Sequence, residues 1–212
     1  CLEAARESEH WQTSLEGKHR GRGVAVGFWF NAGLQSSAAV HVNADGTVNV
    51  VSGNPDIGGS RASLAIMAAE ELGIEYDAVD VLVADTTSIG FNDVTGGSRV
   101  TFATGMAVIE SAREVIRQLR ERAAALFETD VENVIWEDGR ALAPGLKESE
   151  PLDLKTLAAK AGKTGGPISG RHSFSARGVG MGFGAHICDV EVDKETGRVS
   201  VVRYTAVQDA GR

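Results

Sequence analysis

Apolar and polar residues alternate in several short segments of the chain and recur at helical spacing in others. Alternation with a period of two predicts strands, because successive side chains of a strand point to opposite faces. The clearest example is the pair 38–43 and 47–52, which flank the turn Asn43-Ala-Asp-Gly46. A glycine at the end of this turn supplies the positive φ that a short hairpin loop needs. The pattern therefore predicts a β-hairpin.

Helical spacing of apolar residues predicts two main helices. The first covers 61–72 and ends at Gly73, and the second, the longest of the chain, covers 101–127 with charged residues along its outer side. A short polar helix is predicted at the N-terminus. Between the main helices lies the polar loop 85–97, and loops of this length inside compact domains usually have a function.

The remaining segments predict further strands and a small insertion. A second hairpin over 133–143, turning at Glu137-Asp-Gly139, and a short helix over Leu152–Ala161, ended by Gly162, make 133–165 a flap-like insertion. We expect one domain of the α+β class, a two-layer structure whose mixed β-sheet has helices packed on one face. The other predicted strands are 21–30, 78–84, 168–177, 186–193 and 198–207.

Composition and charge narrow the function. The 212 residues are 42% hydrophobic and 24% charged, which is ordinary for a soluble globular protein, and the net charge of −8 makes nucleic acid an unfavourable partner. No apolar run approaches the roughly 20 residues of a membrane-spanning helix. Cys1 and Cys188 form no zinc-binding pattern, and we expect Cys188 to be a buried strand residue. The scattered histidines are interpreted as structural.

Two glycine-containing loops lead directly into the two main helices. The first turn of a helix has backbone N–H groups without partners in the helix, and its dipole favours an anion there. Glycines remove the Cβ atoms that would hold a ligand away, so a phosphate or a polar heterocycle can approach the amides. The candidate binding residues are Gly58, Gly59 and Ser60 in the first loop and Gly96, Gly97, Ser98, Arg99 and Thr101 in the second.

Other interpretations of these loops remain open at this stage. Ser60 and Ser98 can be simple N-caps, and Gly-Gly pairs are common in turns. A generic anion-binding module is a further alternative. The chain lacks a P-loop motif, and the alternate glycines of 178–184 precede no helical pattern, so a dinucleotide site is excluded. Asp56, Asp85 and Asp93 are as readily turn residues as acids, and we identify no catalytic group and no metal site.

Several motifs together resemble the molybdenum-cofactor-binding large subunit of the xanthine dehydrogenase, aldehyde oxidase and carbon monoxide dehydrogenase family. They agree with that family in order and spacing over most of the chain. The stretches are Gly21-Arg-Gly-Val-Ala, the run from Asp56-Ile-Gly-Gly-Ser to Glu71-Leu-Gly-Ile74, Val81-Leu-Val-Ala-Asp-Thr-Thr87, Thr95-Gly-Gly-Ser-Arg-Val-Thr101 and Gln208-Asp-Ala-Gly211.

The resemblance implies that both loops contact a molybdenum-pterin cofactor, carried as molybdopterin or as its cytosine dinucleotide. Gly58 and Gly59 would lie on the first contact, and Gly97, Ser98 and Thr101 on the second. The sequence departs from the family where a Gly-Gln-Gly stretch is replaced by Gly58-Gly59-Ser60, so contact there must be through the backbone or altered. The family's catalytic glutamate lies beyond Arg212, which implies that this chain alone is inactive.

The resemblance also implies a molybdenum-dependent oxidoreductase that hydroxylates an aldehyde or an N-heterocycle with water-derived oxygen. Its partners would be an iron–sulfur subunit, in some members a flavin subunit, and the rest of its own large subunit, in an oligomeric enzyme of the cytoplasm or, alternatively, the periplasm. Both ends of the sequence are expected to continue in a larger protein. The missing glutamine motivates one alternative, a cofactor-less structural or interaction relative of that subunit.

Overall fold

The computed structural model describes residues 1–146, 149–177 and 181–209. The chain divides into two compact units, Ala32–Gly178 and a smaller one built from Cys1–Asn31 and Val179–Arg212. The single-domain organisation stays a prediction. No helix of the described residues is long and apolar enough to cross a membrane.

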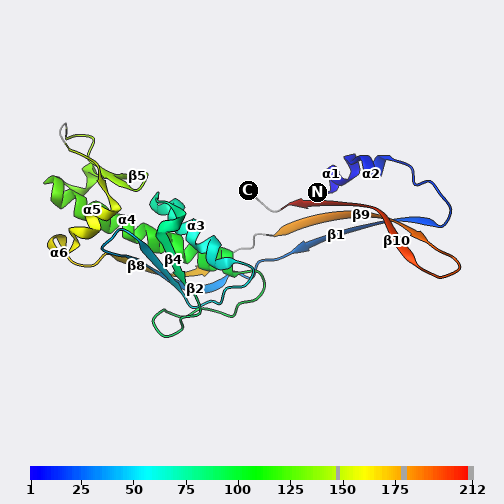
Figure 1. Ribbon diagram of the computed structural model, residues 1–212, viewed down its shortest axis with the longest axis horizontal. Helices are drawn as coiled ribbons and strands as arrows, with labels where there is room; N and C mark the ends of the chain where they lie inside the picture. The colour runs from blue at the N-terminus through cyan, green and yellow to red at the C-terminus, as the bar shows by residue number, and fades with distance from the viewer. Residues whose placement is uncertain (147–148, 178–180, 210–212) are drawn as a thin grey trace. The chain divides into compact units, whose positions relative to one another are not determined.

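The larger unit is built on a four-stranded mixed sheet (Figure 1). The strands lie in the order β4-β3-β2-β8, and β3 and β4 are parallel while the other neighbours are antiparallel. The predicted hairpin is confirmed, since β2 pairs with β3 around a turn in which Gly46 has a φ of 88°. The bounds of the strands are β2 Leu34–Val42, β3 Val48–Ser52, β4 Val79–Leu82 and β8 Ser169–Ala176.

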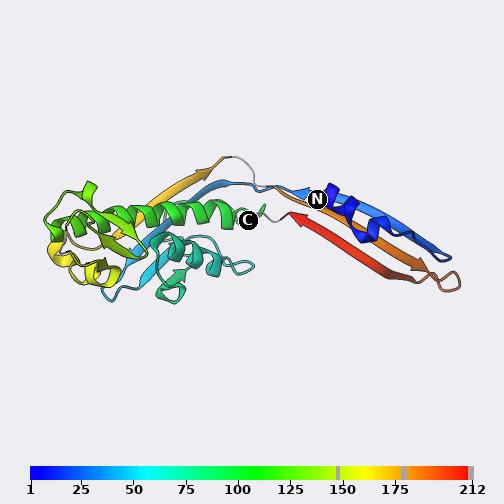
Figure 2. The same ribbon diagram turned by 90° about the horizontal axis from the view of Figure 1, so that it is seen from above.

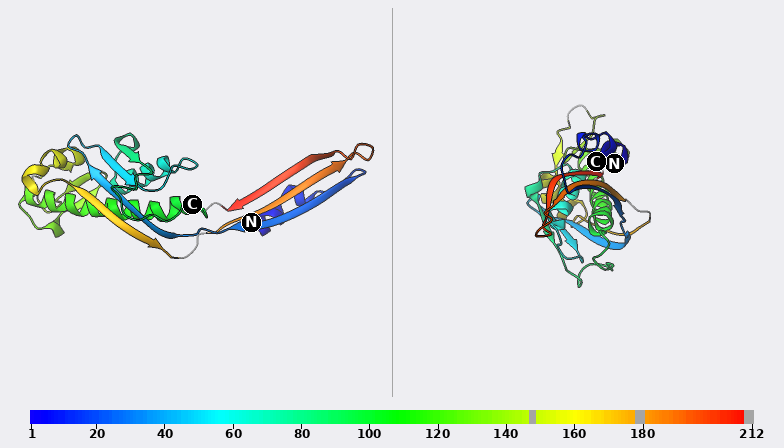
Figure 3. Two further views of the ribbon diagram at one scale, coloured as in Figure 1. Left: turned by 90° about the horizontal axis from the view of Figure 1, so that it is seen from below. Right: turned by 90° about the vertical axis from the view of Figure 1, so that its right-hand side faces the viewer.

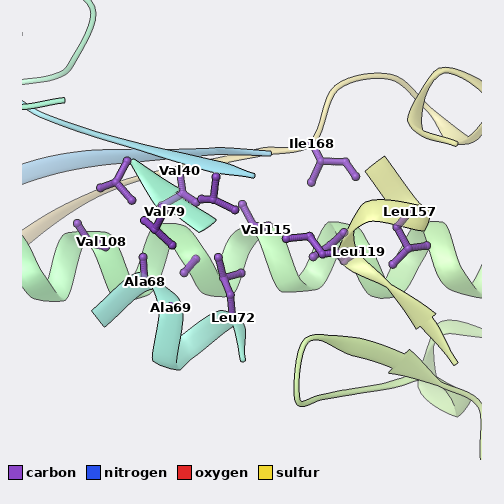
Figure 4. Packing of buried hydrophobic residues seen from close by; sticks show 14 of the residues in the cluster. Val40, Ala68, Ala69, Leu72, Val79, Val108, Val115, Leu119, Leu157 and Ile168 are labelled. Carbon is purple, nitrogen blue, oxygen red and sulfur yellow. The ribbon is translucent and has the colours of Figure 1, made fainter. Parts of the chain in front are cut away.

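Two helices cover one face of this sheet. α3 (Ser60–Leu72) connects β3 to its parallel neighbour β4, and α4 (Gly105–Phe127) runs along the sheet (Figure 2). Side chains from both helices and from the strands form the main core, seen in Figure 4. The fully buried residues of this core include Val40, Val48, Val50, Leu64, Ala68, Leu72, Val108, Val115 and Leu119.

The opposite face of the sheet is covered by a loop. Ala39 and Val51 point away from the helices and pack with Ile89, which belongs to the long polar segment between β4 and α4. Residues adjacent in a strand alternate between the two faces, so Val40 and Val50 face the helices while Ala39 and Val51 face the loop. The predicted α+β class, with a mixed sheet and helices on one face, is confirmed.

The segment between α4 and β8 forms a small sheet of its own, and its predicted helix was placed wrongly. Leu152 pairs with Ala141 in a third strand, and the Asp153 side chain accepts a hydrogen bond from the Thr156 amide, so the helix begins only after Asp153. Gly162 does not end a helix but lies inside a second one, which Gly165 terminates. The elements are β5 Ile135–Glu137, β6 Arg140–Leu142, β7 Leu152–Asp153, α5 Leu154–Ala159 and α6 Ala161–Thr164.

This segment is joined to the core of the larger unit. Val134, Ala141 and Leu157 are fully buried members of the main core, and the Trp136 indole N–H donates to the carbonyl of Leu72 at 2.9 Å. Its description as a flap-like insertion stays a prediction. Short single turns complete this unit at η1 Tyr76–Ala78, η2 Val100–Thr104 and η3 Val131–Asn133.

The smaller unit is a three-stranded antiparallel sheet in the order β1-β9-β10 (Figure 3). Ala5 of the first helix packs with Ala185 and Ile187 of β9 in a small core. Cys188 is half-buried rather than buried, and β9 begins at Gly182, inside the glycine run, whose residues 178–180 lie outside the described residues. The elements are α1 Leu2–Glu7, α2 Glu9–Gln12, β1 Arg20–Trp29, β9 Gly182–Val192 and β10 Val199–Asp209.

Candidate cofactor site

The first glycine loop leads into α3 with two consecutive residues in the left-handed region. Gly58 has a φ of 68° and Gly59 a φ of 82°, and a Cβ built on either would meet no atom within 4 Å. Both glycines are exposed. Their backbone is therefore open to a ligand, and glycine is favoured here because other residues are strained at these angles.

The start of α3 is already occupied by a side chain of the protein. The Asp56 carboxylate accepts hydrogen bonds from the Arg61 amide at 3.1 Å and from the Ser60 hydroxyl at 3.2 Å. Ser60 is buried, and its hydroxyl is therefore used within the loop. The first-turn amides of α3 were expected to be free to bind an anion, and for Arg61 this expectation is wrong. The donors of this loop that remain open lie at the glycines.

The second glycine loop has a different geometry. Gly97 and Ser98 both lie in the left-handed region, with φ of 67° and 55°, and the chain then enters the single π-helical turn η2 before α4. The side chain of its N-cap residue, Arg99, makes no cap hydrogen bond to this turn. Single π-turns occur frequently at functional sites. An uncapped helix start next to exposed Gly96 and Ser98 is the kind of backbone that binds an anion.

Arg99 does not present its charge to a ligand. Its side chain is fully buried, and its guanidinium donates five hydrogen bonds, to four backbone carbonyls and one hydroxyl. Because a guanidinium has five N–H donors, none is left over. Burial is the main cause that lowers the pKa of Arg99. The interpretation of Arg99 as a cation beside the ligand is therefore corrected.

The two loops meet in one hollow. Side chains and backbone from both loops line a cavity of about 330 Å³, which is at the lower end of the range for ligand pockets and fits part of a cofactor rather than the whole. The hollow is lined by backbone, hydroxyls and apolar groups, with no carboxylate among its lining residues. These residues are Ile57, Ser60, Thr95, Gly96, Ser98, Arg99, Val100 and Thr101.

Most of the predicted site residues are thus brought together, but not all of them. Gly58, Gly59 and Gly97 do not line this hollow, and Gly59 instead borders a larger one of about 700 Å³ beside β4. Three carboxylates, those of Asp56, Asp77 and Asp80, line that larger hollow. The smaller hollow is therefore the better candidate for an anionic ligand, because it lacks these charges.

Sequence reasoning did not identify the polar residues beneath the loops. Asn54 and Thr104 are buried, and Thr104 Oγ1 lies 2.8 Å from Asn54 Oδ1. Asn54 Nδ2 in turn donates to Thr95 Oγ1 at 3.0 Å. Nothing in the sequence indicated this contact, since Asn54 looks like a turn residue and Thr104 like part of a helix.

The acidic turn residues and the buried histidine take structural roles. Asp85 accepts hydrogen bonds from the amides of Thr87 and Ser88, and Asp93 accepts one from the Gln35 amide. In the smaller unit, His10 is 1% exposed and lies 2.9 Å from both Asp189 and Thr205, so no substrate reaches it. Among the described residues there is no group of three or more His, Cys, Asp or Glu side chains suited to a metal ion.

Comparison with known proteins shows the family of the chain. The family described as the molybdopterin cofactor-binding domain matches residues 2–212. The 6-hydroxypseudooxynicotine dehydrogenase complex subunit gamma of Paenarthrobacter nicotinovorans is 28% identical over all of this chain and 28% of its own length. The aldehyde oxidoreductase molybdenum-binding subunit PaoC of Escherichia coli is 32% identical over 91% of this chain and 25% of its own length.

A solved structure shows the same fold. The CO dehydrogenase of Oligotropha carboxidovorans superposes with a TM-score of 0.79 at 23% sequence identity, over 91% of this chain and 26% of that one. The chain spans about a quarter of the length of the relatives it matches. Because the family matches nearly the whole length of this chain, the chain belongs to the molybdopterin cofactor-binding domain family.

Proposed function

We propose that this chain forms one wall of the molybdenum-pterin site in the large subunit of a molybdenum hydroxylase. The observation that carries the proposal is the shared hollow, in which the uncapped start of η2 and the exposed backbone around Gly96 and Ser98 meet the first loop. Its lining suits a pyrophosphate or a polar ring, because it offers amides and hydroxyls and no carboxylate. The open space at Gly58 and Gly59 leaves room for the rest of the ligand.

The cofactor supplies the redox chemistry, and the described residues bind and orient it. Ser98 and Thr101 border the hollow, and the Thr101 hydroxyl is of the type that donates to a cofactor's anionic oxygens. At the first loop the contact is through backbone, since the glutamine expected between two glycines is absent and the Ser60 hydroxyl is bonded to Asp56. A single helix start contributes only about 0.3–2 kcal/mol to anion binding, so further contacts from the rest of the large subunit complete the site.

The whole enzyme is proposed to oxidise an aldehyde or an N-heterocycle with water-derived oxygen. This is supported by the relatives, one named for a nicotine-derived substrate and another for aldehydes. The name of the first relative also describes a complex, which supports partner subunits for this chain. We propose that these are an iron–sulfur subunit and a flavin subunit. We place the enzyme in the cytoplasm, with the pterin as molybdopterin or its cytosine dinucleotide.

The proposal is tested on the full-length protein, produced in a host supplied with molybdate, by measuring molybdenum and pterin per chain. We expect the wild type to contain both. Gly97→Val should lose them while keeping its fold by circular dichroism, because a branched side chain at a positive φ distorts the backbone of the second loop.

Gly197→Val is the matched control. Gly197 has a φ of 72° in the turn before β10, so its replacement introduces similar backbone strain outside the candidate site. This variant should retain the wild-type molybdenum content. A molybdenum-free and pterin-free wild type would refute the proposal and favour the cofactor-less structural relative, and full retention in Gly97→Val would refute the assignment of the second loop.

A further inference from the structure

A buried polar network lies directly beneath the two glycine loops. It connects five side chains from four parts of the larger unit, and the hydroxyls of Ser36 and Thr104 and the guanidinium of Arg99 belong to fully buried residues. Asn54 is 3% exposed. Ser36 belongs to β2, Asn54 to the first loop, Thr95 and Arg99 to the second loop, and Thr104 to η2.

The hydrogen bonds of this network run in one direction. Arg99 Nη2 donates to Ser36 Oγ at 2.6 Å, and Thr104 Oγ1 donates to Asn54 Oδ1 at 2.8 Å. Because Thr104 has a single hydroxyl hydrogen, it must accept from Ser36 Oγ, which lies 2.8 Å away.

The orientation of the Asn54 amide is fixed by the same reasoning. Asn54 Nδ2 lies 3.2 Å from the carbonyl oxygen of Asp93, which can only accept, so the amide nitrogen faces the second loop and the amide oxygen faces Thr104. Nδ2 also donates to Thr95 Oγ1. Each side chain of the network therefore has the donor or acceptor that its chemistry requires. The hydrogen bonds of such a series strengthen one another in a low-dielectric interior.

The network fastens both loops to the same strand. Arg99 additionally donates to the carbonyls of Gly33 and Gln35 at the start of β2 and to those of Asp93 and Val94 in the second loop. Of the five side chains of the network, Asn54 is the one that comes from the first loop. Thr104 therefore occupies the junction, since its hydroxyl joins the Arg99–Ser36 end of the network to Asn54.

We infer that this network is the positioning device of the cofactor hollow, with Thr104 and Asn54 holding the two glycine loops in one arrangement before the ligand binds. The inference rests on the proposed function. Preorganised loops bind more tightly, because the apparent dissociation constant rises in inverse proportion to the fraction of molecules in the competent arrangement. Loops that are competent only about a tenth of the time would bind about tenfold more weakly.

The first experiment compares hydrogen–deuterium exchange in the full-length protein without cofactor. Thr104→Val keeps the shape of the side chain but removes its hydroxyl, and we expect the amides of 53–60 and 95–101 to exchange about tenfold faster, both loops together. Thr104→Ser restores the hydroxyl and should return exchange to the wild-type rate. Thr95→Val removes the next hydrogen bond of the network, from Asn54 Nδ2 to Thr95 Oγ1, and replaces Thr104→Val if that variant does not fold.

Ser111→Ala is the matched control. Ser111 is equally buried on α4, and its hydroxyl donates to the carbonyls of Ala38 on β2 and Ala107 on α4. Its loss should lower the melting temperature without accelerating exchange in either loop. Equal loop exchange in Thr104→Val and Ser111→Ala would overturn the inference, because the network would then be a general contributor to stability.

The second experiment measures molybdenum and pterin retained by the full-length variants after gel filtration. We expect about tenfold faster cofactor loss from Thr104→Val and wild-type retention by Thr104→Ser and Ser111→Ala. Wild-type retention by Thr104→Val would overturn the positioning role even if exchange were faster. A wild type without cofactor would be a failure of the proposed function, and the exchange experiment would still decide whether the network fixes the loops.

Discussion

The carboxylate of Asp56 accepts a hydrogen bond from the backbone amide of Arg61 at 3.1 Å, so α3 is capped by a residue that lies before its glycine loop. At the start of η2, the N-cap residue Arg99 makes no side-chain cap hydrogen bond. The two loops therefore look alike in sequence but differ in what they offer a ligand. The first provides open glycine backbone, and the second provides an uncapped helix start.

Removal of the Asp56 cap should destabilise the chain. We expect Asp56→Ala to lower the free energy of unfolding by about 1 kcal/mol, the usual effect of losing an N-terminal cap. Urea denaturation followed by circular dichroism measures the change. Asp130→Ala is the control, since Asp130 precedes η3 without a side-chain cap hydrogen bond. Equal destabilisation in the two variants would contradict a capping role for Asp56.

A second prediction concerns the contact between Gly73 and Gly139. Both have positive φ, and a Cβ on Gly73 would lie 2.5 Å from the Gly139 amide nitrogen. Gly73→Ala must therefore move the 137–140 turn in addition to the backbone strain of about 1–2 kcal/mol for a left-handed alanine. Gly197→Ala has the same sign of φ with no atom within 4 Å, so it should show the strain alone.

The denaturation midpoint of each variant is measured, and the same dependence of the unfolding free energy on denaturant concentration is used for both variants. We expect Gly73→Ala to be clearly less stable than Gly197→Ala, and its Trp136 fluorescence to change, because the Trp136 indole donates to Leu72 next to the substituted glycine. If both alanine variants were destabilised equally, the close contact between Gly73 and Gly139 would make no contribution to stability.

Local chemistry made much of the larger unit predictable. The Gly46 turn, the Gly73 helix end and the alternating strands 38–43 and 47–52 are set by residues close in sequence, and the structure confirms them. Strand partners distant in sequence were not predictable. Arg20 in β1 pairs with Glu191 in β9, 171 residues later, and only the folded chain shows that these end strands form a separate sheet.

The candidate site was predictable as a pair of loops but not as a constellation of atoms. Arg99 looked like a free cation because its neighbours are glycines and hydroxyls. Its guanidinium is instead buried among the carbonyls of Gly33 and Gln35, residues more than 60 positions earlier, and no local pattern indicates that contact. The same holds for Asp189, whose partners His10 and Arg22 lie at the other end of the chain.

The buried ion pairs of Asp189 lead to a prediction about pH. Asp189 on β9 receives two hydrogen bonds from the Arg22 guanidinium on β1, at 2.7 and 2.8 Å, and lies 2.9 Å from His10 Nε2 of α2. Arg203 is its neighbour on β10. Hydrogen bonding by Arg22 is the largest cause that holds the pKa of Asp189 far below its ordinary value.

A carboxyl whose pKa is lowered by folding stabilises the native state wherever it is ionised in both states, so its contribution is full above the unfolded pKa of about 3.9. As pH falls below that value toward the lower folded pKa, protons bind the unfolded chain first and the contribution is lost. We expect the difference in melting temperature between wild type and Asp189→Asn to shrink as the pH falls below about 4.

Glu191→Gln, on the same strand in a partly exposed pair with Arg20, should change the melting temperature little at any pH. A difference for Asp189→Asn that grew as the pH fell below about 4 would contradict the assignment, since it would require the folded pKa of Asp189 to be raised.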